Sequence, residues 1–267
     1  RRVERGGVSV GVSGDPLFPA RAVKRNEEIR QIGAAQQAAV IAMRSATAMI
    51  GEARIGHDGR LWHGGGFLTS EGVRLRIAEV LLRENCTARD IIVAGGRQSA
   101  DPHEAGSGPL AAGEPIVIDI FPRNAGGYWG DITRTIARGK PSQECMRMYT
   151  AVKAAQSAAL SRVKPGVQCG TVHKAAAEEL RRRGFRTGMI DGRPQGFIHS
   201  TGHGVGLSVH EEPAVSISKT RLRAGNVITV EPGLYYSAVG GVRIEDTVVV
   251  SRGGWDHLAP CEKRFQI

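Results

Sequence analysis

Residues 115–121, PIVIDIF, and residues 130–137, GDITRTIA, form two β-branched runs, each of which carries one aspartate. Asp119 interrupts an otherwise apolar strand, where a buried carboxylate is costly unless a positive charge meets it. Asp131, Thr133 and Thr135 are two positions apart and therefore share one polar face of their strand. A turn at Gly126-Gly127 would bring the second run back toward the first. We therefore expect the two aspartates to meet across a hairpin.

Two later runs, 227–234 (VITVEPGL) and 241–250 (GVRIEDTVVV), repeat this arrangement. Glu231 ends an apolar strand just before Pro232-Gly233. Glu245 shares a strand face with Arg243, and Asp246 lies on the opposite face. A single acid so placed could be an ion pair or a solvated strand end, but four such acids together with histidines indicate a shared site.

Helical patterns separate these strand pairs. A short strand is predicted at 91–93, and the order of helices, strands, helices and strands favours an α+β domain of two similar halves, in which helices cover one face of a mostly antiparallel sheet. Four helices are predicted from capping residues and apolar spacing: one capped by Asn26 with Ile29, Ile32, Val40 and Met43; one from Ser70 with Val73, Ile77, Leu81 and Leu82; one capped by Ser142 with Met146, Tyr149, Val152 and Leu160; and one capped by Thr171.

The histidines gather in residues 199–213, HSTGHGVGLSVHEEP. His199 and His203 have the spacing of a helical zinc pair, but the interleaved glycines argue against a helix. They indicate an extended, tightly turned segment whose backbone passes close to a ligand or metal. The GxGxG string lacks both the dinucleotide-binding spacing and the lysine of a phosphate loop, so it gives little support for nucleotide binding.

Four carboxylates and one imidazole make an oxygen-rich donor set. Two divalent ions would neutralise the four negative charges, and manganese suits such a set best, with cobalt, iron or zinc as alternatives. Paired metals lower the pKa of a shared water, so hydrolysis is the expected reaction.

Composition leaves several classes open and excludes others. The chain has 267 residues, 41% of them hydrophobic, and a net charge of +10. That charge could indicate a nucleic-acid binder, but the basic residues are dispersed, and the run 181–183 suits the C-terminal end of a helix. No apolar run approaches the roughly 18 residues of a membrane span. The four scattered cysteines indicate reduced thiols and a cytoplasmic protein. Residues 1–23 are expected to be a linker or the remnant of an N-terminal domain, followed by a catalytic domain at 24–267.

The segments IDIFPRNAGGYWGDITRT, HSTGHGVGLSVHEEP, TVEPGLYY and GGVRIEDTVV resemble, in order, the signature segments of the pita-bread metallopeptidases. That family, with the creatinase/aminopeptidase fold, includes Xaa-Pro aminopeptidases, prolidases and methionine aminopeptidases. The resemblance, from about Lys24 onward, implies a dinuclear exopeptidase that uses a metal-bridging hydroxide. It implies metal ligation by Asp119, Asp131, His203, Glu231 and Glu245.

The resemblance also implies that Asp131 and Glu245 bridge the metals and that Glu231 shuttles protons. His210 and His103 are expected in catalysis, and His199, His210 and Arg243 in substrate binding. These residues are identified from the resemblance. Asp119 and Asp131 are twelve positions apart, one more than is usual in the family. If the extra residue fell inside a strand, Asp119 would face away from the site.

Arg243 in the string RIED favours the Xaa-Pro branch, with a methionine aminopeptidase as the alternative. Arg243 could pair with Glu245 or a bridging acid, or it could bind a substrate carboxylate. A metal-free, creatinase-type hydrolase is disfavoured because the ligands are present. A non-catalytic relative that binds nucleic acid or protein is the alternative of another class, and it is disfavoured for the same reason. Peptides with proline second are the expected partners, with no membrane association and a possible homodimer.

Overall fold

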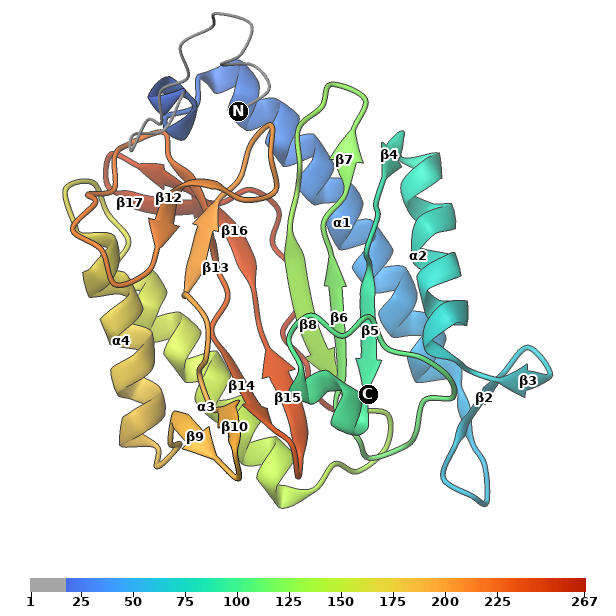
Figure 1. Cartoon of the computed structure of the whole chain (residues 1–267). Coiled ribbons are helices and arrows are strands. Elements are labelled where there is room, and N and C mark those ends of the chain that lie inside the picture. The colour runs from blue at the N-terminus through green and yellow to red at the C-terminus, as the bar shows by residue number, and fades with distance from the viewer. Residues whose placement is uncertain (1–17) are drawn as a thin grey trace, which may run out of the picture.

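A computed structural model describes residues 18–267, which form two halves lying side by side (Figure 1). In the N-terminal half, α1 (Asn26–Glu52) and α2 (Ser70–Arg83) pack against the antiparallel sheet β5-β6-β8. In the C-terminal half, α3 (Gln143–Leu160) and α4 (Cys169–Arg182) pack together beside the antiparallel sheet β12-β11-β13-β16-β17. The predicted α+β architecture of helices over antiparallel sheets is confirmed.

The remaining elements are short. Their bounds are η2 (Pro19–Ala22), β1 (Arg54–Ile55), β2 (Leu61–His63), β3 (Gly66–Phe67), β4 (Cys86–Thr87), β5 (Ile92–Gly95), η3 (Gly96–Ala100), β6 (Ile116–Ile120), β7 (Arg123–Asn124), β8 (Ile132–Ile136), β9 (Gly188–Ile190), β10 (Arg193–Gln195), β11 (Gly202–Gly204), β12 (Glu211–Val215), β13 (Val227–Val230), β14 (Gly233–Tyr236), β15 (Gly240–Arg243), β16 (Asp246–Ser251) and β17 (Gly254–His257).

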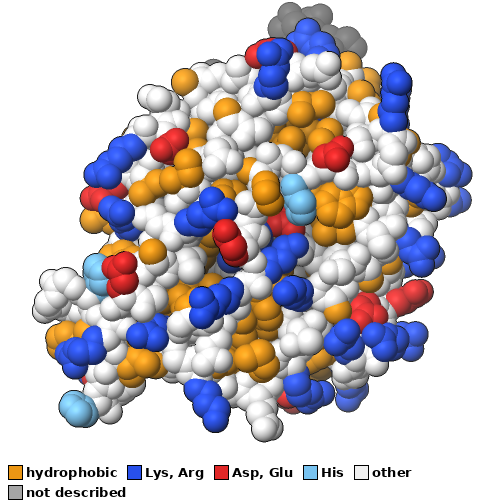
Figure 2. Space-filling model, turned by 180° about the vertical axis from the view of Figure 1, so that it is seen from behind, with side chains coloured by type: hydrophobic (Ala, Val, Ile, Leu, Met, Phe, Trp, Pro, Cys, Tyr) orange, Lys and Arg blue, Asp and Glu red, His pale blue; other side chains and the backbone are white. Residues whose placement is uncertain are grey.

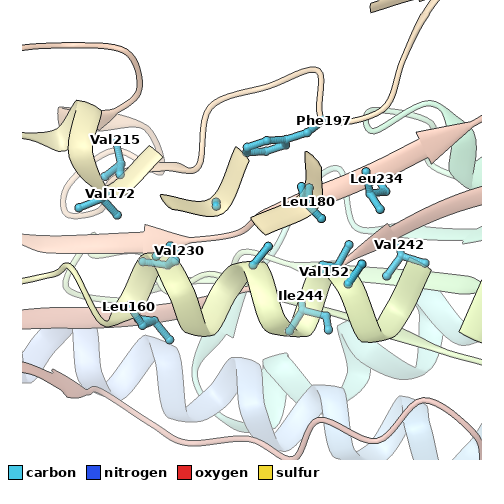
Figure 3. Close-up of a cluster of buried hydrophobic side chains, with 14 of the residues drawn as sticks. Val152, Leu160, Val172, Leu180, Phe197, Val215, Val230, Leu234, Val242 and Ile244 are labelled. Carbon is cyan, nitrogen blue, oxygen red and sulfur yellow. The ribbon is translucent and has the colours of Figure 1, made fainter. Parts of the chain in front are cut away.

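Each half has its own apolar core. Helices α1 and α2 and strands β5, β6 and β8 supply the first, which includes Met43, Ile77 and Ile118. Figure 3 shows the second, in which side chains of α3 and α4 meet those of the C-terminal strands, such as Val152 of α3 and Val230 of β13. Two of the apolar residues that define the predicted helices lie outside these cores, because Leu82 and Met146 are 64% and 38% exposed.

The helix starts agree with the sequence only in part. The Ser142 hydroxyl accepts a hydrogen bond from the Cys145 N–H (3.1 Å) and caps α3 as predicted. Asn26 is not a cap: it is the first residue of α1, and the Glu28 carboxylate accepts from the Arg25 N–H instead (2.9 Å). The predicted Thr171 cap is also wrong, since α4 begins two residues earlier, at Cys169. Local capping alternatives of this kind have similar free energies, so tertiary packing chooses among them.

Both long C-terminal strands predicted from the sequence are broken. The run at 227–234 divides into β13 and β14, and the run at 241–250 divides into β15 and β16. Glu231 lies in the first break, and Ile244 and Glu245 lie in the second. The ladders therefore end beside the residues that the sequence predicts as metal ligands.

The N-terminal boundary is described from residue 18 onward. Residues 1–17 of the predicted 1–23 linker lie outside the described residues. Within the rest, η2 carries Arg21, whose guanidinium contacts the Glu211 carboxylate (2.5 Å), and Lys24 contacts the same carboxylate (2.6 Å). Across residues 18–267, no helix combines the length and apolar character needed to cross a membrane. All four cysteines lie in this range and are free thiols.

Candidate metal centre

A cavity of about 720 Å³ lies where the two halves meet. Strands β5 and β6 and the residue before β8 border it from the N-terminal half, and the segments around β11, β13 and β15 border it from the C-terminal half. All the residues predicted for the site line this one cavity: Asp119, Asp131, His203, Glu231, Glu245, His103, His199, His210 and Arg243.

Asp119 reaches the cavity because the β6–β8 ladder is regular. Asp119 pairs with Thr133, and Ile120 pairs with Ile132 at the end of the ladder. The additional residue between the two aspartates therefore lies outside the paired segments, in the connection between them. The Asp119 side chain therefore points from β6 toward the cavity.

Three of the predicted ligands form a compact group. Ligand atoms of Asp131, His203 and Glu245 all lie within 4.8 Å of one another, so these residues could hold a metal ion. The Glu245 Oε2 atom accepts a hydrogen bond from the Thr133 hydroxyl (2.8 Å). That bond fixes one carboxylate oxygen from the neighbouring strand.

The orientation of His203 suits metal ligation through Nε2. Its Nδ1 lies 3.1 Å from the Gly204 carbonyl oxygen, to which an Nδ1–H would donate. Nε2 then faces the acids, 3.2 Å from Glu231 Oε1 and 3.6 Å from Asp131 Oδ2. A backbone carbonyl that holds the second ring nitrogen is the usual support for a metal-binding histidine.

Burial and mutual repulsion perturb the acids strongly. Burial and then the negative charge of Glu245 raise the pKa of Asp131 well above its usual value. Burial and the charge of Glu231 likewise raise the pKa of Glu245. For Glu231, burial acts in the same direction, but the hydrogen bond and charge of His203 outweigh it and lower its pKa to about 2. Only one member of the cluster is thus strongly stabilised as an anion.

Arg243 connects Asp119 to a buried tyrosine. Its Nη2 donates to Asp119 Oδ2 (2.7 Å), and its Nη1 donates to the Tyr235 hydroxyl (2.7 Å). The Tyr235 hydroxyl lies 2.9 Å from His199 Nε2, and His199 Nδ1 lies 2.7 Å from the Ser200 carbonyl oxygen. The ion-pair partner of Arg243 is therefore Asp119, and not Glu245 or the other acid expected to bridge the metals, Asp131.

The donor set fits divalent metal ions. Asp119 Oδ1 is buried and has no hydrogen-bond partner among the described residues, so an oxygen lone pair remains available beside Asp131 and Glu231. Buried carboxylates are ordinarily paired or bound to metal. Arg243 and His203 alone do not balance four acids, and additional positive charge would relieve the repulsion.

The glycines of the histidine segment do permit a close approach, but the neighbour is protein backbone. A Cβ atom on Gly202 would lie 2.1 Å from the Thr229 carbonyl oxygen, and one on Gly204 would lie 2.3 Å from that of Glu212. The segment forms β11, as its extended pattern predicts. Glycine therefore lets β11 fit between β12 and β13, which sets His203 against Glu231.

His103 and His210 differ from the buried ligands because both are exposed at the cavity. The ring of His210 meets that of His203 edge to face, with centroids 4.1 Å apart. These positions are accessible to a bound substrate.

Four residues that support this site have no role that the sequence predicts. Tyr235 and Thr229 lie within the segment TVEPGLYY. Thr229 accepts from the His203 N–H (3.1 Å), and its hydroxyl lies 3.2 Å from Glu231 Oε1. Gln36 and Gln156 lie on helices far from the motifs in sequence. A polar residue on the apolar face of each helix was the available signal.

The basic run at 181–183 has a structural explanation. Arg182 and Arg183 both contact the Glu179 carboxylate, at 2.8 and 2.6 Å, and Gly184 ends the helix with φ of 86°. On the face that Figure 2 shows, Lys and Arg side chains are scattered among acidic and apolar ones. Neither the run at 181–183 nor the face in Figure 2 presents a continuous basic surface to which nucleic acid could bind.

Comparison with known proteins agrees with this geometry. Residues 30–252 match the model of metallopeptidase family M24. A Xaa-Pro dipeptidase of Pyrococcus furiosus is 39% identical over 180 residues, which cover 67% of this chain and 49% of the relative. The chain thus spans about half the length of the curated relatives it matches.

Solved structures show the same fold. The prolidase from Pyrococcus furiosus has a TM-score of 0.79 and 34% identity, with 91% of this chain and 67% of that chain covered. The X-Pro aminopeptidase from Thermotoga maritima has a TM-score of 0.79 and 32% identity, with 93% and 65% covered. The chain belongs to metallopeptidase family M24 and has the pita-bread fold of its prolidases.

Proposed function

We propose that this chain is the catalytic domain of a dinuclear exopeptidase that releases the first residue of peptides with proline second. The observation that carries the proposal is the convergence of Asp119, Asp131, His203, Glu231 and Glu245 on one cavity. The similar proteins named Xaa-Pro dipeptidase, prolidase and X-Pro aminopeptidase support the choice of substrate.

These five residues would hold two divalent ions, and the oxygen-rich set favours manganese, with cobalt, iron or zinc as alternatives. Such ions, when bound, would acidify water and polarise the scissile carbonyl. Asp131 and Glu245 are proposed to be the residues that would contact both ions, and their membership in the compact group with His203 supports a role in metal binding.

Glu231 is the proposed proton carrier. Its carboxylate is ionised near neutrality and lies in the cavity, 3.2 Å from His203 Nε2, where it could accept a proton from the attacking water. Water adds to the carbonyl carbon, the carbon–nitrogen bond breaks, and the departing nitrogen takes the proton. The nitrogen of a Xaa-Pro bond carries no hydrogen of its own, so this transfer is required for release of proline as an amine.

The remaining residues are proposed to hold the peptide. His103 and His210 are exposed in the cavity and can hydrogen-bond the substrate, and His199 and Arg243 line the same wall. An adjoining cavity of about 960 Å³ shares Pro102, His103 and His199 with the first. It offers space for residues that follow the proline.

Release of the first residue from Xaa-Pro dipeptides and tripeptides tests this function. The purified protein is stripped with a chelator and then supplied with Mn²⁺. We expect turnover only after metal addition, and we expect Glu231→Gln to abolish it. Glu262→Gln, a matched change at an exposed ion pair, should retain it.

Failure on every Xaa-Pro peptide, with cleavage of Met-Ala peptides, would instead assign the methionine aminopeptidase activity. No hydrolysis of either class by metal-supplied protein would overturn the proposal.

A further inference from the structure

Two buried glutamines, one from each half, form hydrogen bonds with the main chain at or next to proposed metal ligands. Gln36 lies on α1 and Gln156 on α3, and their exposed fractions are 1% and 0%. A buried amide side chain is costly unless it is hydrogen-bonded, so the partners of these two residues indicate why glutamine occupies each position.

Gln36 makes a two-bond contact with the main chain of Asp131. Its Oε1 accepts from the Asp131 N–H (2.7 Å), and its Nε2 donates to the Asp131 carbonyl oxygen (2.9 Å). Asp131 lies one residue before β8, beyond the end of the ladder with β6. The side chain thus supplies the partners that a neighbouring strand would provide inside the ladder.

The approach of α1 to this segment depends on Gly130. A Cβ atom at this position would lie 2.6 Å from the Gln36 backbone nitrogen and 2.7 Å from the Ala35 carbonyl carbon. Glycine therefore lets the helix backbone lie directly against the chain that leads into Asp131.

Gln156 acts in the same way on the C-terminal half. Its Nε2 donates to the carbonyl oxygens of Val230 (2.9 Å) and Ile244 (3.2 Å). These residues immediately precede Glu231 and Glu245, at the two places where the long strands are broken. A single amide group thus connects the chain segments that carry two of the proposed ligands.

The Oε1 atom of Gln156 has no partner among the described residues. An apolar side chain would remove that unsatisfied oxygen but would also remove the donor that the two carbonyl groups share. Burying the unpaired Oε1 atom costs free energy. The presence of glutamine despite this cost indicates that its Nε2 donor is what this site needs.

We infer that Gln36 and Gln156 are positioning residues that set the separation of the ligand carboxylates and thereby the affinity for metal. This inference rests on the proposed function. The side-chain hydrogen bonds of the two residues go to main-chain atoms only, so each residue acts through the ligand beside those atoms. Outer contacts that orient metal ligands typically change metal affinity by about 10–100-fold when they are removed.

Gln36→Met and Gln156→Met test the inference, because methionine retains the length of the side chain and removes its hydrogen bonds. Gln195→Met is the matched control. Gln195 is buried and donates to the Ile190 carbonyl oxygen (2.7 Å), and it accepts from the Ser237 N–H (2.9 Å), but neither residue adjoins a proposed ligand.

Mn²⁺ affinity is measured by calorimetry on the folded, metal-free proteins, with thermal unfolding recorded beside it. We expect all three variants to lose stability, and only Gln36→Met and Gln156→Met to bind Mn²⁺ about tenfold or more weakly. Their kcat should fall more than their KM changes, because no substrate contact is removed.

Gln36→Glu keeps the acceptor for the Asp131 N–H and gives a second measurement if Gln36→Met does not fold; we expect it to bind Mn²⁺ more weakly than wild type. Wild-type Mn²⁺ affinity in the Gln36 and Gln156 variants would overturn the inference alone. A wild-type protein that binds no divalent ion would overturn both the inference and the proposed function.

Discussion

The guanidinium of Arg243 lies 2.7 Å from the Asp119 carboxylate; the arginine side chain is buried, and 13% of the aspartate side chain is exposed. They come from opposite halves of the fold, Arg243 from β15 and Asp119 from β6. Arg243 also donates to the Thr133 hydroxyl (3.1 Å), which in turn donates to Glu245. This arginine therefore balances the acid cluster and joins the two halves across the cavity.

Replacing Arg243 with leucine should destabilise the metal-free protein by about 3–5 kcal/mol, because Asp119 would remain buried without its cation. Arg44→Leu, which removes an exposed pair with Glu262, should cost at most about 1 kcal/mol. Denaturant unfolding with chelator measures both. Equal losses in the two variants would show that the buried pair contributes no special stability.

Metal should stabilise the fold increasingly as pH rises. Burial and neighbouring charge raise the pKa values of Asp131 and Glu245, so their folded forms hold protons that the unfolded chain has lost. In the metal-free protein, the free energy of unfolding that these bound protons contribute is present at low pH. It is lost as pH rises through the pKa values of the folded state. Glu231, with its pKa of about 2, stays ionised over this range and contributes no change.

Thermal unfolding at a series of pH values from about 5 to 8, with Mn²⁺ or with chelator, tests this sign. We expect the difference in Tm between the two conditions to widen as pH increases. At a free metal concentration of 100 times Kd, one bound ion adds about 2.7 kcal/mol. A gap that narrows with rising pH would contradict the assigned shifts.

Tyr235 and Tyr236 provide a matched comparison of a buried and an exposed hydroxyl. The Tyr235 hydroxyl contacts Arg243 and His199, whereas that of Tyr236 donates to the Arg186 carbonyl oxygen (2.7 Å). Tyr235→Phe should cost about 1.5–3 kcal/mol, since it removes a hydrogen bond to a buried charged group.

Tyr236→Phe should cost about 1 kcal/mol or less, because water can replace its exposed contact. Denaturant midpoints at constant m-value compare the two. A larger loss for Tyr236→Phe would place the important hydroxyl outside the cavity.

The sequence predicted which acids line the cavity, because a carboxylate in an apolar strand is a clear pattern. The roles of the histidines came from the family resemblance. It predicted the helices through their spacing, although Asn26 and Thr171 proved not to be caps. It did not predict the breaks at Glu231 and Ile244. A β-branched run has the same local preference on both sides of a break. The hydrogen bonds made at the breaks involve Gln156, Thr201 and Thr133, which lie far away in sequence.

Arg243 shows the same limit at the level of one side chain. Its position in RIED placed it on the face of Glu245, which is correct for a continuous strand. The break before Glu245 and the approach of β6 give it Asp119 as the ion-pair partner instead. Such a choice depends on how two halves pack, and alternation along one strand carries no information about it.

Two glycine substitutions test how closely α1 must approach the loop that carries Asp131. Gly130→Ala would bring a Cβ atom to 2.6 Å from the Gln36 backbone, which cannot move without shifting the helix. Overpacking of this kind should cost about 1–3 kcal/mol and should also weaken Mn²⁺ binding, because Gln36 would lose its hold on Asp131.

Gly33 is the control on the same helix, since a Cβ atom there would meet nothing within 4 Å. Gly33→Ala should stabilise the protein by about 0.5–1 kcal/mol through helix propensity and should leave the Mn²⁺ affinity unchanged. Unfolding and calorimetric titration of the two variants separate the contact from a general effect of alanine. If Gly130→Ala bound Mn²⁺ as tightly as Gly33→Ala, the close approach of α1 would have no part in setting the metal site.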